Sequence, residues 1–165
     1  MGQKHSKEKN IQRIQANGHK IRPEETLNAW KVPATSEFPV PGGRPDYMWV
    51  ETGGSRAGFQ HMQAKGRSQQ FEQAGIPQAE QREKLPILAE AHTTVGRYIG
   101  EQGKDRPIMA THIDGRVHRN AITVGSNGYV VSMNPVSSGK LKLKPGNPGV
   151  PRTDLRQGKA KGCDR

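Results

Sequence analysis

Two turn dipeptides constrain the fold of this chain more than any other feature. Asp114-Gly115 and Asn127-Gly128 each lie between stretches in which apolar and polar residues alternate. Both dipeptides favour the type I′ turn of a two-residue hairpin, whose central residues both need positive φ. The sequence therefore predicts a meander of three antiparallel strands, at about residues 107–113, 116–126 and 129–133.

The predicted register divides these strands into two faces, because side chains alternate along a strand. If Asn127 and Gly128 form the whole loop, the apolar face pairs Ser126 with Tyr129, Val124 with Val131 and Ile122 with Met133. The opposite face then carries Arg119, Thr123, Ser132 and His112. We expect the apolar face to form the core and the polar face to be a surface suited to phosphate chemistry.

Helices are predicted before the meander. Apolar residues are weakly helical in spacing from Gly58 to about Ala74, and a second helix is expected at about Gln78–Thr94, kinked or restarted at Pro86. Val95–Gly100 reads as a turn into a further strand. The fold class is therefore α+β, with helices packed on a small antiparallel sheet and with flexible basic tails.

Prolines and glycines between residues 32 and 46 predict a linker, since such a segment sustains neither a helix nor a central strand. We expect residues 1–55 to be a basic N-terminal segment with this linker. Within it, a short helix around Ile11 and Ile14 is too polar for docking to be expected. Residues 56–136 are predicted to form the functional domain, and residues 137–165 a disordered tail.

The charge distribution suggests a polyanionic partner. The formal net charge is +11, and residues 137–165 hold eight Lys and Arg against two acidic residues. Residues 1–31 hold seven against three, so the domain itself is nearly neutral. Clustered cations bind nucleic acid by releasing counterions from phosphates. Lys140, Lys142 and Lys144 are the candidate RNA-binding residues of the tail, although solvated basic tails explain the charge equally well.

Other classes of protein find little support. Cys163 is the single cysteine and can form no internal disulfide, and no stretch has the length and hydrophobicity of a membrane span. The start Met1–Ser6 fits an N-myristoylation pattern, which leaves lipidation of Gly2 open. The six histidines lack metal-binding spacing, and no phosphate-binding glycine loop precedes a helix. We therefore predict neither a metal site nor a cofactor.

Candidates for metal-free cleavage of RNA are present. Such a reaction needs a base for the 2′-OH proton, an acid for the leaving 5′ oxygen, and cations or hydroxyls at the phosphate. His61 at the start of the first helix and His118 in the central strand could transfer protons. Arg119 could bind two phosphate oxygens at once. Each of these residues could instead be a solvated residue or a packing residue.

The run from Arg119 to Pro135 resembles the closing meander of bacterial toxin modules of the barnase, EndoU, colicin and RelE-like ribonuclease superfamily. Gly58–Met62 resembles the histidine-bearing entry motif of that group, and Arg106-Pro107-Ile108 resembles its strand opening. The resemblance covers about residues 56–135 and neither tail. Departures are His118 and Asn120, which flank Arg119, and the loosely similar loop 96–103.

The resemblance implies roles for particular residues. His61 would be the acid or base, Arg119 the phosphate clamp and Thr123 a hydroxyl on the same phosphate, with Arg106, His118 and Ser132 as secondary candidates. It also implies a tRNA-cleaving endonuclease that leaves 2′,3′-cyclic phosphate ends. Such a toxin is secreted or delivered, acts as a monomer in the cytoplasm of a target cell, and is neutralised by an acidic immunity protein.

Two other functions stay open. A non-catalytic nucleic-acid-binding protein, of phage or ribosome-associated type, would depend on its basic tails and not on His61. An enzyme of another class, such as an ADP-ribosyltransferase, has only the Arg and Ser on the predicted strands in its favour.

Overall fold

The computed structural model describes residues 2–40, 43–103 and 106–136, and these form an α+β fold with antiparallel sheets. In chain order the elements are α1 (Gly2–Ala16), the 3-10 helix η1 (Pro23–Glu25), β1 (Thr26–Lys31), β2 (Tyr47–Glu51), α2 (Phe59–Met62), α3 (Arg67–Gln73), α4 (Gln78–Thr94), β3 (Arg97–Gln102), β4 (Arg106–Ile113), β5 (Arg116–Val124) and β6 (Val130–Pro135).

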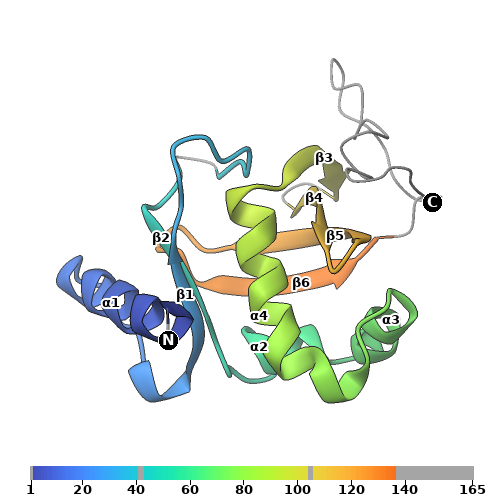
Figure 1. Cartoon of the computed structure of the whole chain (residues 1–165), viewed down its shortest axis with the longest axis horizontal. Helices are drawn as coiled ribbons and strands as arrows, with labels where there is room; N and C mark the ends of the chain where they lie inside the picture. The colour runs from blue at the N-terminus through green and yellow to red at the C-terminus, as the bar shows by residue number, and fades with distance from the viewer. Residues whose placement is uncertain (1, 41–42, 104–105, 137–165) are drawn as a thin grey trace.

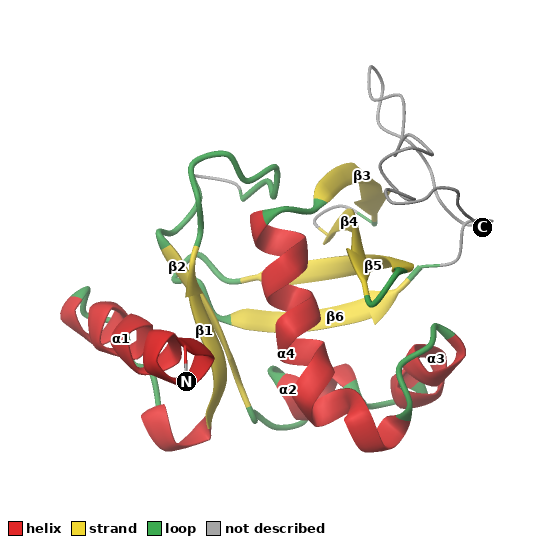
Figure 2. Cartoon of the chain, viewed as in Figure 1, coloured by secondary structure: helices red, strands yellow, loops and turns green. Residues whose placement is uncertain are grey.

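The centre of the fold is a four-stranded antiparallel sheet in the order β3-β4-β5-β6. Helix α4 crosses one face of this sheet, and β1 and β2 form a separate two-stranded ladder beside it (Figures 1 and 2). The arrangement confirms the predicted meander, with strand β3 added on the side of β4.

The first hairpin forms as predicted. Ile113 pairs with Arg116, so Asp114 and Gly115 are the two loop residues. Their φ values of 52° and 74° are both positive, as a type I′ turn requires. Sequence chemistry alone was sufficient here, because few residues other than Gly, Asn and Asp adopt this backbone conformation readily.

The second hairpin differs from the prediction by one residue. Gly128 donates its N–H to the carbonyl of Gly125, and Asn127 is not among the residues with positive φ. The loop is therefore Ser126–Gly128, with Val124 opposite Val130 rather than Val131. A bulge beside Val124 absorbs the extra residue, so Ile122 still pairs with Met133 and the predicted faces hold farther from the turn.

The N-terminal residues are docked on the fold, contrary to the expectation of a flexible tail. Helix α1 buries Ile11 and Ile14 against Ala29 and Trp49 of the β1–β2 ladder. Strand β2 in turn meets the start of β6 in a parallel bridge, in which Trp49 N–H donates to the Gly128 carbonyl at 3.1 Å. Asn10 Nδ2 of the same helix also donates to the Ala29 carbonyl at 2.9 Å. A stripe of two apolar residues is too short for periodicity to predict this docking.

The segment predicted to be a linker also packs on the fold. Val32 and Phe38 are buried in the main core, and Ser36 Oγ donates to the Thr93 carbonyl at 2.7 Å. Glu37 accepts a hydrogen bond from Tyr98 N–H at 3.0 Å. The prolines exclude regular secondary structure here but do not exclude burial, because the backbone groups of the segment find partners within it: Val32 N–H donates to the Asp46 carbonyl at 2.8 Å and Phe38 N–H to Ser36 Oγ at 3.1 Å.

The helical prediction is correct for α4 and only partly correct before it. Helix α4 spans Gln78–Thr94 and continues through Pro86, whose carbonyl accepts from Asn28 Nδ2. The stretch expected as one helix is divided into α2 and α3, because Lys65 and Gly66 adopt positive φ between them.

One hydrophobic core joins both halves of the chain. Helix α4 contributes Leu85, Leu88 and Ala89, and the sheet contributes Met109, Ile122 and Met133. Aromatic and aliphatic side chains of the first 55 residues complete the same core: Trp30, Val32, Phe38, Met48 and Val50. The expected boundary at residues 55 and 56 thus runs through a shared core.

A substitution at Gly128 would test the junction between β2 and β6. A Cβ at this position would lie 2.1 Å from the Tyr47 carbonyl oxygen, and φ is +106°. Gly128→Ala should therefore cost roughly 1–2 kcal/mol for the backbone conformation and a further ~1–3 kcal/mol for the overlap, measured by urea unfolding.

Gly18 provides the matched control for this substitution. Its φ is +88°, and a Cβ there would meet nothing within 4 Å. Gly18→Ala should show only the conformational cost. Equal losses of unfolding free energy for the two variants would contradict the proposed junction.

Candidate functional site

The sheet face opposite α4 is concave and carries a polar network. Arg106 Nη1 donates to Asn134 Oδ1 at 3.1 Å and to Gln102 Oε1 at 3.3 Å, and Asn134 Nδ2 donates to Gln102 Oε1 at 3.2 Å. Gln102 lies on β3 and Asn134 on β6, at opposite edges of the sheet. In a flat sheet these strands would be ~14 Å apart. The contacts therefore require strong curvature, and they hold the Arg106 guanidinium in one position.

Two hydroxyl side chains lie on the same face beside Arg106. Thr123 pairs directly with Ser132, which brings their Cβ atoms to roughly 5 Å. The β4–β5 register, continued from Ile108 opposite Ala121, sets Arg106 opposite Thr123. Ser132 is 5% exposed, and its Oγ has no hydrogen-bond partner among the described residues. We name these five residues, Gln102, Arg106, Thr123, Ser132 and Asn134, the polar corner.

Arg119 is on the predicted face but away from Thr123. It pairs with Ala110, and its carbonyl accepts from Val136 N–H at 3.0 Å. Four residues along a strand separate it from Thr123 by ~13 Å. Buried Ala121 lies between them, in a small apolar cluster with Ile99, Ile108, Ala110 and Val136. The structure thus groups Thr123 and Ser132 with Arg106 and not with Arg119.

His61 lies on α2 in a fixed orientation. Its Nδ1 is 2.9 Å from the Ser55 carbonyl oxygen, which can only accept, so Nδ1 carries the proton. Nε2 is then the basic nitrogen, and Arg67 Nη1 lies 3.5 Å from it while also donating to the His61 carbonyl at 3.2 Å. Sequence reasoning identified His61 but missed Arg67, since only the break between α2 and α3 returns Arg67 to the histidine.

The segment that carries His61 borders strand β6. Gly58 N–H donates to the Val131 carbonyl at 2.9 Å, one residue from Ser132. Phe59 and Met62 of α2 enter the core on the α4 side of the sheet, whereas Ser132 points to the concave side. No hydrogen bond in the described part of the chain joins the His61 side chain to Thr123 or Ser132. His61 and the polar corner therefore flank the same edge strand from different sides.

His118 is not on the polar face. It lies on the α4 side with Asn120, and it is 5% exposed. Asn120 Nδ2 is 2.8 Å from His92 Nε2, and His92 is fully buried. Burial lowers the pKa of His92 to about 3, with a smaller effect from His118, and burial together with nearby Arg116 lowers the pKa of His118 to about 4. Both histidines are neutral core residues at pH 7, which argues against His118 as an RNA-facing group.

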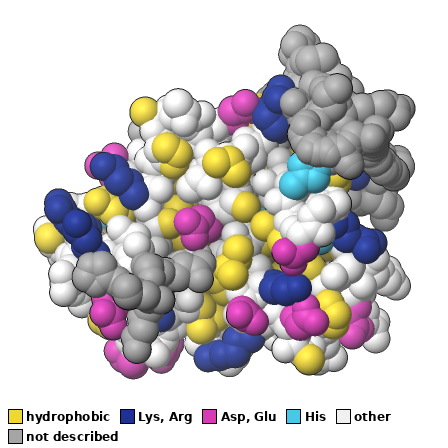
Figure 3. Space-filling view, in the orientation of Figure 1, with side chains coloured by type: hydrophobic (Ala, Val, Ile, Leu, Met, Phe, Trp, Pro, Cys, Tyr) yellow, Lys and Arg dark blue, Asp and Glu magenta, His cyan; other side chains and the backbone are white. Residues whose placement is uncertain are grey.

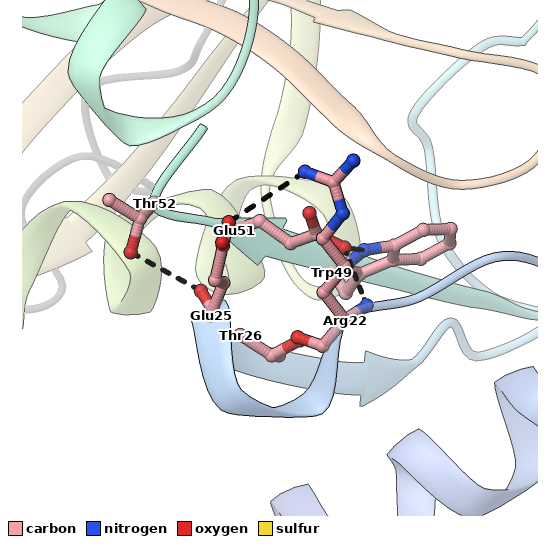
Figure 4. A network of polar contacts seen from close by, with 6 residues as sticks. All are labelled: Arg22, Glu25, Thr26, Trp49, Glu51 and Thr52. Carbon is pink, nitrogen blue, oxygen red and sulfur yellow. Dashed lines mark hydrogen bonds and ion pairs between the residues drawn. The ribbon is translucent and has the colours of Figure 1, made fainter. Parts of the chain in front are cut away.

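A second polar network joins β2 to the start of β1 (Figure 4). Glu51 is 4% exposed, and its Oε2 accepts from Trp49 Nε1 at 2.8 Å and from Arg22 N–H at 3.0 Å. Thr52 N–H donates to the Glu25 carbonyl at 2.9 Å. These bonds satisfy a buried carboxylate within the fold, and they indicate a structural role for Glu51.

A hollow in the described surface lies away from the polar corner. One cavity of about 460 Å³ lies between α1, β1 and α4, and its walls include Lys7, Leu27, Arg82 and Ile87. Figure 3 looks onto this side of the molecule, where hydrophobic side chains alternate with charged ones and no single charge dominates. No side chain of the polar corner lines this cavity.

Some predicted features fall outside what can be described. Lys140, Lys142 and Lys144 lie beyond the described residues. Within the described ranges, no group of three or more His, Cys, Asp and Glu side chains could hold a metal ion. No described helix is long and apolar enough to cross a membrane.

Comparison with known proteins does not assign the chain to a family. No protein-family model matches the chain, and a search of curated proteins finds no match to its sequence. The chemistry of the site is therefore argued from its own residues.

The buried histidines make stability depend on pH. In the folded state the pKa is about 3 for His92 and about 4 for His118, and both values are below the ~6.5 of an unfolded histidine. Their stabilising contribution is therefore complete above pH ~6.5 and is lost as the pH falls toward 4. The unfolding free energy should fall between pH 7 and 5 by up to ~1.4 kcal/mol per pH unit for each histidine.

His92→Gln isolates one of the two contributions. A glutamine does not titrate and can still accept from Asn120 Nδ2, so the slope in urea unfolding experiments should fall by about half. His61→Gln, on the surface helix α2, serves as the comparison. An unfolding free energy that does not change from pH 7 to pH 5 would contradict the neutral buried pair.

Proposed function

We propose that this chain is a metal-independent RNA endonuclease with a fold of the barnase, EndoU, colicin and RelE-like type. The observation that carries the proposal is the orientation of His61, whose Nε2 is left as a base beside Arg67. A positioned imidazole next to a guanidinium suits proton transfer at a phosphodiester, where the substrate brings negative charge.

In the proposed reaction, His61 Nε2 removes the 2′-OH proton of RNA. The 2′ oxygen attacks the adjacent phosphorus, the bond to the 5′ oxygen breaks, and that oxygen takes a proton from a water molecule. The hydroxide left behind takes back the proton held by His61. The products are a 2′,3′-cyclic phosphate and a 5′-OH.

Arg67, beside His61, would stabilise the charge on the oxygens of the reacting phosphate, because a donor fixed in advance needs no reorganisation. Arg106 and the Thr123 and Ser132 hydroxyls would hold another phosphate of the same strand on the concave side of β6. His118 is left out, since it is buried in the core.

The biological role belongs to the same proposal. We infer a toxin module that enters a target cell, acts as a monomer in its cytoplasm and cleaves tRNA. An acidic immunity protein covering the concave face of the sheet would neutralise it. The tail 137–165, with eight Lys and Arg against two acidic residues, would add affinity for RNA that depends on salt.

RNA cleavage in EDTA tests the proposal. Purified protein incubated with total tRNA should produce fragments with 2′,3′-cyclic phosphate ends. His61→Ala should lower the rate by about 100-fold or more, the usual contribution of a general base. His19→Gln is the matched control, because His19 lies against Trp49 in the N-terminal half.

Two outcomes would contradict this function. RNA that stays intact with the wild-type protein under all conditions removes the endonuclease proposal. Binding without cleavage, weakened by salt and by deletion of residues 137–165 but unaffected by His61→Ala, would instead support the non-catalytic nucleic-acid-binding protein.

A further inference from the structure

The polar corner has the composition of an anion site. Arg106 reaches from β4 toward β6 over small side chains of the central strand, Ala121 and Thr123, and its guanidinium is held by Asn134 Oδ1 and Gln102 Oε1. These two bonds engage one nitrogen, and a guanidinium has five N–H donors in all. An arginine fixed in this way loses little side-chain freedom when it binds an oxyanion.

Ser132 supplies an independent observation. Its side chain is buried, and across residues 2–40, 43–103 and 106–136 its Oγ finds no hydrogen-bond partner. Buried hydroxyls nearly always have a partner, because an unsatisfied one costs free energy. Ser132 lies two residues from Asn134 on the same face and directly opposite Thr123. A ligand oxygen at the corner would accept the hydrogen bond that Ser132 cannot make within the described part of the chain.

We propose that the polar corner is a phosphate subsite. Arg106 binds the phosphate oxygens, Ser132 donates its hydroxyl proton to one of them, and Thr123 lies at the rim. Gln102 and Asn134 are positioning residues that act through Arg106. The assignment of this phosphate to an RNA strand rests on the proposed function, whereas the affinity for phosphate itself does not.

Arg106 and not Arg119 is the arginine of this subsite. Arg119 is ~13 Å along the strand from Thr123, with the apolar cluster around Ala121 between them. A second phosphate of the same strand could contact Arg119. The two arginines would then bind successive positions on an extended polyanion, which fits a single strand better than a compact mononucleotide.

The direct test is titration of the full-length protein with inorganic phosphate, followed by two-dimensional NMR. The backbone amides of Ser132 and Asn134 and the Arg106 side-chain N–H signals should shift together and saturate. Sulfate provides a second tetrahedral anion of similar size. Shifts confined to other residues, or no saturation at tens of millimolar phosphate, would overturn the subsite.

Variants separate the subsite from structural roles. Arg106→Gln should weaken phosphate binding by about tenfold or more, and Arg119→Gln by less. Arg44→Gln removes the same charge from the exposed loop before β2 and should leave the affinity unchanged. A larger loss for Arg119→Gln than for Arg106→Gln would contradict the assignment.

Ser132→Ala gives a readout that a merely structural serine would not show. Removing an unsatisfied buried hydroxyl should leave the melting temperature unchanged or raise it, while phosphate binding weakens by about threefold. A fall in melting temperature with unchanged phosphate affinity would overturn the role of Ser132. This variant also remains informative if Arg106→Gln fails to fold.

The two proposals can fail separately. Phosphate binding at the polar corner without any RNA cleavage would keep the subsite and remove the endonuclease. Cleavage of RNA that Arg106→Gln and Ser132→Ala leave at the wild-type rate, with no phosphate shifts at the corner, would keep the endonuclease and remove the subsite.

Discussion

The packing of the N-terminal half of the chain on the meander depends on the contacts made by the two edges of strand β6. One edge pairs with β5 in a regular antiparallel ladder, and the other edge would present unpaired backbone groups. Trp49 and Gly58 each donate a backbone N–H to that edge, at Gly128 and Val131 respectively. These two bonds connect the N-terminal half of the chain to the meander. They also bring the segment carrying His61 next to the strand carrying Ser132.

The two faces of the sheet differ in the side chains that they carry. On the α4 side, burial is mostly apolar, and the imidazoles of His92 and His118 are kept neutral by the loss of water around them. On the concave side, a small apolar cluster lies beside a network of charged and amide groups. The curvature of the sheet makes the concave face suited to binding an anion, because it brings side chains of the first and last strands within hydrogen-bonding distance.

The candidate chemistry is divided between two places that share one strand. His61 and Arg67 could handle protons at the outer edge of β6, while Arg106 and Ser132 could hold an anion on its concave side. The Ser55 carbonyl orients His61, and Gln102 and Asn134 orient Arg106, and none of these three neighbours needs to touch a substrate. A substrate engaging both would have to cross the edge of the sheet, which an extended strand of RNA can do and a small metabolite cannot.

The sequence determined those features whose causes are local. Asp114-Gly115 specified its hairpin, the apolar spacing specified α4, and alternation assigned Ile122 and Thr123 to opposite faces. It also identified Arg106, Thr123 and Ser132 as candidates, although not which arginine accompanies the hydroxyls.

Only the tertiary structure decided the features that depend on contacts distant in sequence. The prolines after Val32 predicted a linker, yet Phe38 is buried because α4 and β3 lie beside that segment. Alternation places His118 on the same face as Ile122, but whether that end of the face is buried was decided by the packing of α4. Arg106 joined Asn134 because the sheet curves. Local pattern fixes turns and faces, while burial and side-chain pairing depend on which elements pack together, and that is set by the free energy of the whole core.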